Sequence, residues 1–180
     1  MYHVPKQKTT RVYNIDTDYV NQLHSIDKKV EYHHGEHDKP YLGIILEING
    51  TNYFVPLSSP KPKHNRMSEN ITFKKIEKDG HLFAVLNINN MIPVPLNLCK
   101  EIDIDNISDT YYKHLLNQEY FICKRKKRDI MKSAGIVHKC ICEEPESHEK
   151  MLSRENKIYE ESNFNILFRL ILIRVIMVFI

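Results

Sequence analysis

The chain has 180 residues, of which 42% are apolar and 27% charged, and its formal net charge is +3 at pH 7. This length allows one sizeable hydrophobic core and leaves no room for a second catalytic module. Four cysteines, gathered toward one end, are too few for a disulfide framework, and the first residues lack the apolar run of a secretory signal, so we expect a cytoplasmic protein.

The first half of the chain has the pattern of a short helix followed by β-hairpins. Asp16 or Asp18 can cap a helix whose apolar residues, Tyr19, Val20, Leu23 and Ile26, fall mostly at helical spacing. Asn49-Gly50 and Asp79-Gly80 are dipeptides typical of two-residue hairpins, and each separates two β-prone runs. The sequence therefore predicts four antiparallel strands, over 41–48, 51–57, 71–76 and 81–88. Residues 91–96 can add a fifth, which its two prolines restrict to an edge or a bulge.

The second half has the pattern of helices. Apolar residues at three- and four-residue spacing from Tyr112 to Cys123 predict a helix behind a cap at Ser108 or Asp109. A further segment near 130–137 is broken by Gly135, and Ser147 can cap a last helix. Strands followed by helices predict an α+β fold, in which helices from the C-terminal half cover a twisted antiparallel sheet or partial barrel. We expect one domain over residues 1–165.

The tail, residues 166–180, is apolar except for Arg169 and Arg174. It is shorter than the roughly 20 residues of a membrane-spanning helix, and its arginines make insertion costly, so we expect no membrane partner. Three readings stay open: a segment packed on the core, a membrane anchor, and a non-native tail produced by a frameshift or read-through.

The segment 53–67, YFVPLSSPKPKHNRM, has the composition of a site for a phosphodiester. Its apolar strand opens into two hydroxyls, Ser58 and Ser59, followed by Lys61 and His64. Hydroxyls and cations can hold a phosphate, an imidazole can move a proton, and the intervening prolines stiffen the backbone. Cleavage of RNA without a metal needs these same roles, although a solvated turn would use the same residue types.

A second feature is a run of cations on the predicted helix. Residues 111–139 hold eight Lys and Arg against two acids, which indicates a face that binds polyanions. The run itself is Lys124, Arg125, Lys126, Lys127 and Arg128, preceded by Tyr120 and Phe121, whose rings can stack on an unpaired base. A solvated helix end is the alternative for the cations, and a place in the core is the alternative for Phe121.

Metal ligation has weaker support. His138, Cys140, Cys142 and His148 are residue types that bind zinc, but Cys-x-Cys is not the usual spacing and there is no second cysteine pair. The histidines of the loop EYHHGEHDKP are more typical of a polar loop than of a metal site. No glycine-rich phosphate loop is present, so we expect neither a metal nor a cofactor.

Four motifs, taken in order, resemble the ToxN/AbiQ family of type III toxin–antitoxin endoribonucleases. They are the opening helix within VYNIDTDYVNQL, Lys39 before Tyr41-Leu42-Gly43, Ser58-Ser59-Pro60-Lys61 with His64-Asn65, and Asn87 before Met91-Ile92-Pro93. The likeness spans roughly 11–161. It implies a compact fold related to the mRNA interferases, metal-independent cleavage of RNA that leaves a 2′,3′-cyclic phosphate, and a role in abortive infection. It also implies inhibition by a small repetitive RNA antitoxin within a hetero-oligomeric protein–RNA assembly.

The resemblance places Lys39, Ser58, Ser59 and Lys61 on the family's active-site positions, and His64 is our candidate for proton transfer because of its chemistry. Many relatives carry Thr where Ser58 stands, and relatives can carry a Tyr shortly before the lysine, for which Tyr32 is the nearest candidate here. Besides the basic run, Tyr120 and Phe121, we assign RNA contacts to Tyr32, Tyr41, Lys63, Asn65, Arg66 and Asn87. The alternatives are a non-catalytic RNA-binding protein, a membrane-associated protein, and an inactive or truncated toxin remnant.

Overall fold

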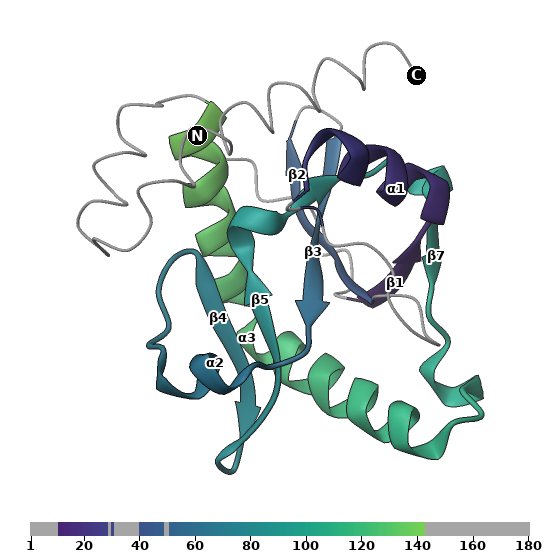
Figure 1. The fold of residues 1–180 in the computed structure, drawn as a ribbon, viewed down its shortest axis with the longest axis vertical. Coiled ribbons are helices and arrows are strands. Elements are labelled where there is room, and N and C mark those ends of the chain that lie inside the picture. The colour runs from purple at the N-terminus through teal and green to yellow at the C-terminus, as the bar shows by residue number, and fades with distance from the viewer. Residues whose placement is uncertain (1–10, 29, 31–39, 49–50, 143–180) are drawn as a thin grey trace.

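The computed structural model describes residues 11–28, 30, 40–48 and 51–142. Figure 1 shows a sheet with a long helix, α3, running behind it and a short helix, α1, on the other side. In chain order the elements are β1 (Arg11–Ile15), α1 (Thr17–Ile26), β2 (Tyr41–Ile48), β3 (Thr51–Ser58), α2 (Pro62–Arg66), β4 (Phe73–Lys78), β5 (His81–Asn87), η1 (Ile88–Asn90), β6 (Ile92–Pro93), η2 (Leu96–Leu98), β7 (Cys99–Glu101), η3 (Ile104–Asn106) and α3 (Thr110–Cys142).

The seven strands form one antiparallel sheet in the order β4-β5-β3-β2-β1-β7, with the short β6 paired to β3. This arrangement confirms the predicted α+β fold with an antiparallel sheet. The sheet does not close into a barrel, because its path ends at β4 on one side and β7 on the other.

The predicted hairpins are present. Asp79 and Gly80 both have positive φ, 51° and 78°, as a two-residue turn between twisted strands requires. The turn Asn49-Gly50 lies outside the described residues, but the strands it joins, β2 and β3, pair as expected. The strand predicted over 71–76 begins two residues later, at Phe73, because the Asn70 side chain accepts hydrogen bonds from the backbone N–H groups of Thr72 and Phe73 and holds a turn there.

Three strand predictions need correction. The sequence analysis missed β1 and β7, which extend the sheet beyond β2. Of the fifth strand predicted over 91–96, only Ile92 and Pro93 pair with β3, and the chain then turns into η2.

The helix caps follow the sequence. Asp16 accepts a hydrogen bond from the backbone N–H of Tyr19 at the start of α1, and Asp109 accepts from those of Tyr111 and Tyr112 at the start of α3. The break predicted at Gly135 is wrong, because α3 continues through it to Cys142. Buried Ala134 and Val137 flank this glycine, so packing offsets its weak helix propensity. The helix predicted after Ser147 lies outside the described residues.

Two hydrophobic clusters cover the two faces of the sheet. One joins Tyr53, Val55 and Leu57 of β3 to buried residues of α3, such as Leu116 and Ile130. The other joins Phe54 of the same strand to Tyr19, Val20 and Leu23 of α1. Strand β3 is therefore buried on both faces, which fixes the position of the loop that follows it.

Candidate functional site

The serine-lysine motif lies in the short loop between β3 and α2. Ser58 is the last residue of β3, pairs with Val85 of β5, and is only 7% exposed. Ser59 and Lys61 are exposed. Both serines were predicted to hold a phosphate. Ser59 lies at the surface, whereas Ser58 is mostly covered by the surrounding structure.

Helix α2 begins directly after Lys61, with Pro62 in its first turn. The ring of His64 is 6% exposed and packs against Phe73, with the ring centroids 5.6 Å apart. Its Nδ1 atom accepts a hydrogen bond from the backbone N–H of Lys61 at 3.0 Å, and its own backbone N–H donates to the Lys61 carbonyl oxygen at 2.8 Å. His64 thus lies beneath the loop, and Lys61 lies on the surface.

A hollow of about 440 Å³ adjoins this loop. The loop and α2 contribute Pro60, Lys61, Pro62 and Asn65 to its walls, and the turn between β4 and β5 contributes Gly80, His81 and Leu82. Figure 1 shows α2 and this turn at the same end of the molecule. The ammonium group of Lys75 donates a hydrogen bond to the Asn65 carbonyl oxygen at 3.1 Å, which fastens α2 to β4.

His81 was missed by the sequence analysis. It is exposed, its ring meets that of Phe83 edge to face at a centroid distance of 4.4 Å, and it lines the hollow with Lys61. The Asp79-Gly80 turn could have revealed this residue. His81 directly follows that turn, and the hairpin lies next to β3, so His81 comes close to the loop that follows β3.

The other predicted site residues divide into three groups. Lys39 and Tyr32 lie outside the described residues. Lys63 and Arg66 are exposed on α2, and Asn87 is half-buried at the end of β5. Tyr41 is 1% exposed within the cluster beneath α1, so its ring lies in the core rather than on the surface where the predicted RNA contact would form.

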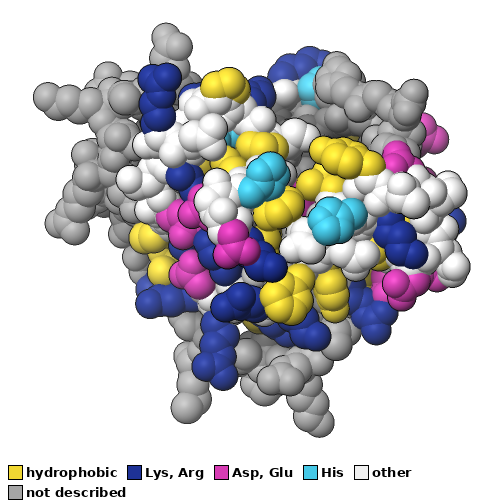
Figure 2. Space-filling model, turned by 90° about the horizontal axis from the view of Figure 1, so that it is seen from below, with side chains coloured by type: hydrophobic (Ala, Val, Ile, Leu, Met, Phe, Trp, Pro, Cys, Tyr) yellow, Lys and Arg dark blue, Asp and Glu magenta, His cyan; other side chains and the backbone are white. Residues whose placement is uncertain are grey.

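The basic run on α3 divides between exposed and half-buried side chains. Lys124, Arg125 and Arg128 are exposed, and Lys127 is half-buried. The ammonium group of Lys126 instead donates to the Glu69 carboxylate at 2.7 Å and to the Lys75 carbonyl oxygen at 2.8 Å, joining α3 to β4. Figure 2 shows Lys and Arg side chains gathered along one margin of the face seen from below, with acidic side chains among them.

The two aromatic residues before the run differ in surroundings. Phe121 is 50% exposed, and the Arg125 guanidinium lies over its ring, 5.9 Å from the centroid.

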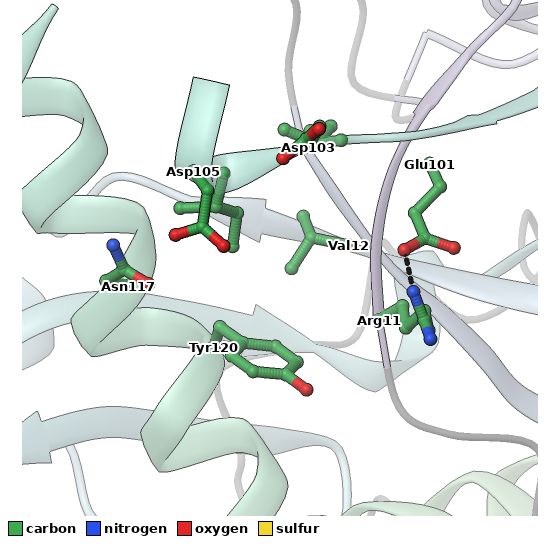
Figure 3. Close-up of a pocket in the computed structure, with 9 residues that line it drawn as sticks. Arg11, Val12, Glu101, Asp103, Asp105, Asn117 and Tyr120 are labelled. Atoms are coloured by element: carbon green, nitrogen blue, oxygen red, sulfur yellow. Dashed lines mark hydrogen bonds and ion pairs between the residues drawn. The ribbon is translucent and has the colours of Figure 1, made fainter. Parts of the chain in front are cut away.

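Tyr120 lines a second hollow, of about 520 Å³, with Asn117 of α3. Figure 3 shows Asp103 and Asp105 on the walls of this hollow and the ion pair between Arg11 and Glu101 at one end. Three carboxylates against one guanidinium make this hollow acidic, so it repels a phosphate backbone.

One acidic side chain of α3 is buried. Glu119 of α3 is 6% exposed, and burial raises the pKa of its carboxyl to about 8. The group is therefore mostly protonated, and neutral, over much of the pH range in which exposed carboxyls are charged.

No three His, Cys, Asp or Glu side chains come together as a metal site within the described residues. Of the residues weighed and rejected as zinc ligands, His138 is buried and its Nε2 atom lies 3.3 Å from the hydroxyl of Tyr53, and His148 lies outside the described residues. In the part of the chain that the structure describes, no helix is long and apolar enough to cross a bilayer. The tail at 166–180 lies outside that part.

Comparisons with known proteins agree on one family. The sequence model of the family described as "Toxin ToxN, type III toxin-antitoxin system" matches residues 11–163. Endoribonuclease ToxN of Bacillus thuringiensis subsp. kurstaki is 35% identical over 132 residues, which cover 72% of this chain and 67% of that protein. Endoribonuclease AbiQ of Lactococcus lactis subsp. lactis is 28% identical over 162 residues, covering 84% of this chain and 86% of that protein.

Solved structures show the same fold. One, from a study of type III toxin–antitoxin systems in which a non-coding RNA pseudoknot selectively inhibits the toxin, has a TM-score of 0.66 and 32% identity, and the match covers 75% of this chain and 81% of that chain. Another, from a study of a processed non-coding RNA that regulates a bacterial antiviral system, has a TM-score of 0.67 and 25% identity, and covers 73% of this chain and 85% of that chain.

Proposed function

Because this chain belongs to the ToxN toxin family of type III toxin–antitoxin systems, we propose that it is an endoribonuclease toxin that cuts RNA in the cytoplasm. The observation that carries the proposal is the loop after β3, where Ser59 and Lys61 are exposed beside a hollow. Related proteins named as endoribonucleases support the reaction class.

The proposed reaction is a metal-independent transesterification. The 2′ oxygen of the substrate attacks the neighbouring phosphorus, a bond from O2′ to phosphorus forms, and the bond from phosphorus to O5′ breaks. The 2′ hydroxyl loses its proton to a base, the 5′ oxygen gains one, and the products are a 2′,3′-cyclic phosphate and a 5′ hydroxyl. Lys61 stabilises the negative charge that develops on the phosphorane, with Lys39 as its proposed partner, while Ser59, the exposed one of the two serines, donates a hydrogen bond to a phosphate oxygen.

The regulator in this proposal is a small repetitive RNA that binds the toxin in a hetero-oligomeric assembly and holds it inactive. The inhibition of a related toxin by a non-coding RNA supports it. The exposed cations of α3, Lys124, Arg125 and Arg128, are the proposed phosphate contacts outside the active site. The biological role that follows is growth arrest of an infected cell, which limits the spread of phage.

The test is cleavage of RNA by the purified protein in the presence of a chelator, followed by analysis of the new ends. We expect cleavage with EDTA and a cyclic phosphate at the 3′ end. Lys61→Ala should abolish both cleavage and toxicity to the host, while Lys100→Ala, an exposed lysine on β7, should leave both unchanged. If the protein binds RNA but does not cut it, the chain is a binding protein, and if Lys61→Ala remains toxic, Lys61 has no part in the reaction.

A further inference from the structure

His64 and Lys61 are joined by two reciprocal hydrogen bonds around the first turn of α2. The His64 ring accepts from the Lys61 backbone N–H, and the His64 backbone N–H donates to the Lys61 carbonyl oxygen. In helix terms Lys61 is the N-cap residue and His64 the third helical residue, the position at which Glu or Gln completes a capping box. The imidazole here replaces that acidic or amide side chain.

This geometry limits the chemistry of the ring. Because Nδ1 uses its lone pair to accept from Lys61, the neutral ring carries its proton on Nε2. The ring is only 6% exposed, and one side is against Phe73. A group that exchanges protons with a substrate must come within hydrogen-bond reach of it, and a ring buried beneath the loop is badly placed for this.

We propose that His64 is a positioning residue, which fixes the backbone of Lys61 so that its ammonium group is presented at the hollow beside α2. The loop it controls is short, since only Ser59, Pro60 and Lys61 separate β3 from α2. Lys61 is extended, with φ −110° and ψ 157°, as expected before a proline, and the bond from its N–H to the His64 ring ties this last residue of the loop to α2. The inference rests on the proposed function, because it assigns to His64 a part in the same reaction.

The decisive comparison is between two substitutions at position 64. His64→Gln keeps a side chain that can accept from the Lys61 N–H, but it cannot exchange protons as an imidazole does. His64→Ala keeps neither ability. We expect His64→Ala to lower kcat for RNA cleavage about a hundredfold, because displacement of the lysine by about 1 Å is enough for such a loss. The kcat of His64→Gln should be at least about tenfold higher than that of His64→Ala, because Gln can complete the capping box. His114→Ala and His114→Gln, at an exposed site on α3, are matched controls that should behave as wild type.

If His64→Gln is folded, as judged by its melting temperature, and is as inactive as His64→Ala, the positioning role is overturned and proton transfer by His64 is favoured.

A second measurement, on the wild-type protein, does not depend on RNA cleavage. Long-range ¹H–¹⁵N spectra should show the His64 ring as the tautomer protonated on Nε2, with the Lys61 amide slow to exchange with solvent. A ring protonated on Nδ1 would overturn the inference.

The two proposals fail in different ways. If the wild-type protein cuts no RNA, the proposed function fails, whereas the ¹H–¹⁵N spectra still decide whether His64 holds the backbone of Lys61. If the wild type cuts RNA and the spectra show the other tautomer, only the inference about His64 fails.

Discussion

Replacing Glu119 with Gln should remove a pH dependence from the stability of this protein. Burial raises the pKa of this carboxyl in the fold from its ordinary value of 4.5 to about 8. Below about pH 4.5 the group is protonated in both the folded and the unfolded chain. Between these two values only the folded chain holds the proton, so unfolding releases it and the free energy of unfolding falls as pH rises. Above about pH 8 the group is ionised in both states and its contribution is constant.

The size of the effect follows from the pKa. A rise of this extent corresponds to roughly 3 to 5 kcal/mol of stability lost between pH 4.5 and 8, at up to about 1.4 kcal/mol per pH unit. The neutral amide of Glu119→Gln has nearly the same shape and does not titrate. The variant should therefore match the wild type near pH 5 and exceed its free energy of unfolding by a few kcal/mol near pH 8.

The assay is urea unfolding at half-unit steps from pH 5 to pH 8.5, analysed as the difference between wild type and variant at each pH. The matched control is Glu77→Gln on β4, which makes the same change at an exposed side chain. Parallel stability curves for the wild type and Glu119→Gln would refute the argument, because they would mean that the buried carboxyl has the same proton affinity in the folded and unfolded chain.

Four further substitutions test other parts of the structure. A Cβ atom on Gly43 would overlap two carbons at the edge of the Tyr13 ring, so Gly43→Ala should lower the free energy of unfolding by about 1–3 kcal/mol, and an unchanged urea midpoint would contradict the close approach. Lys126→Ala should cost about 1–2 kcal/mol of stability and leave the salt dependence of RNA binding unchanged. Lys124→Ala should leave stability unchanged and lower the slope of log binding constant against log salt concentration by about 1. The reverse pattern would assign the phosphate contact to Lys126. Tyr19→Phe removes the hydroxyl that donates to the buried Pro93 carbonyl oxygen at 2.6 Å, which should cost about 1–3 kcal/mol in the same unfolding assay, and a wild-type midpoint would mean that this bond adds nothing.

The parts of the fold that follow from local chemistry could be predicted from the sequence. Asp79-Gly80 determines its hairpin because both residues adopt positive φ, and Asp16 and Asp109 determine where helices begin. The edge strands could not be found in this way. β1 and β7 have five and three residues, and they are strands because each pairs with a distant segment rather than because of their own composition.

The part of the candidate site formed by residues that are close in sequence could also be predicted. Ser59 and Lys61 are neighbours in the sequence, so their proximity required no knowledge of the fold. Lys126 is different, since its partners Glu69 and Lys75 are 57 and 51 residues away and the sequence shows only another cation in a run. Likewise, Tyr41 and Leu42 at the start of β2 are both buried, in different clusters, so alternation there could not show that Tyr41 points into the core.

The separation of charge along α3 has a consequence for how a polyanion would meet this protein. The acidic hollow lined by Asp103 and Asp105 adjoins α3 at Asn117 and Tyr120, while Lys124, Arg125 and Arg128 are exposed farther along the helix. A nucleic acid strand nearby is therefore pushed away at one end of the helix and drawn in farther along. Charges of opposite sign at two places on one helix would favour one docking orientation of the strand over its reverse, as well as speed the encounter.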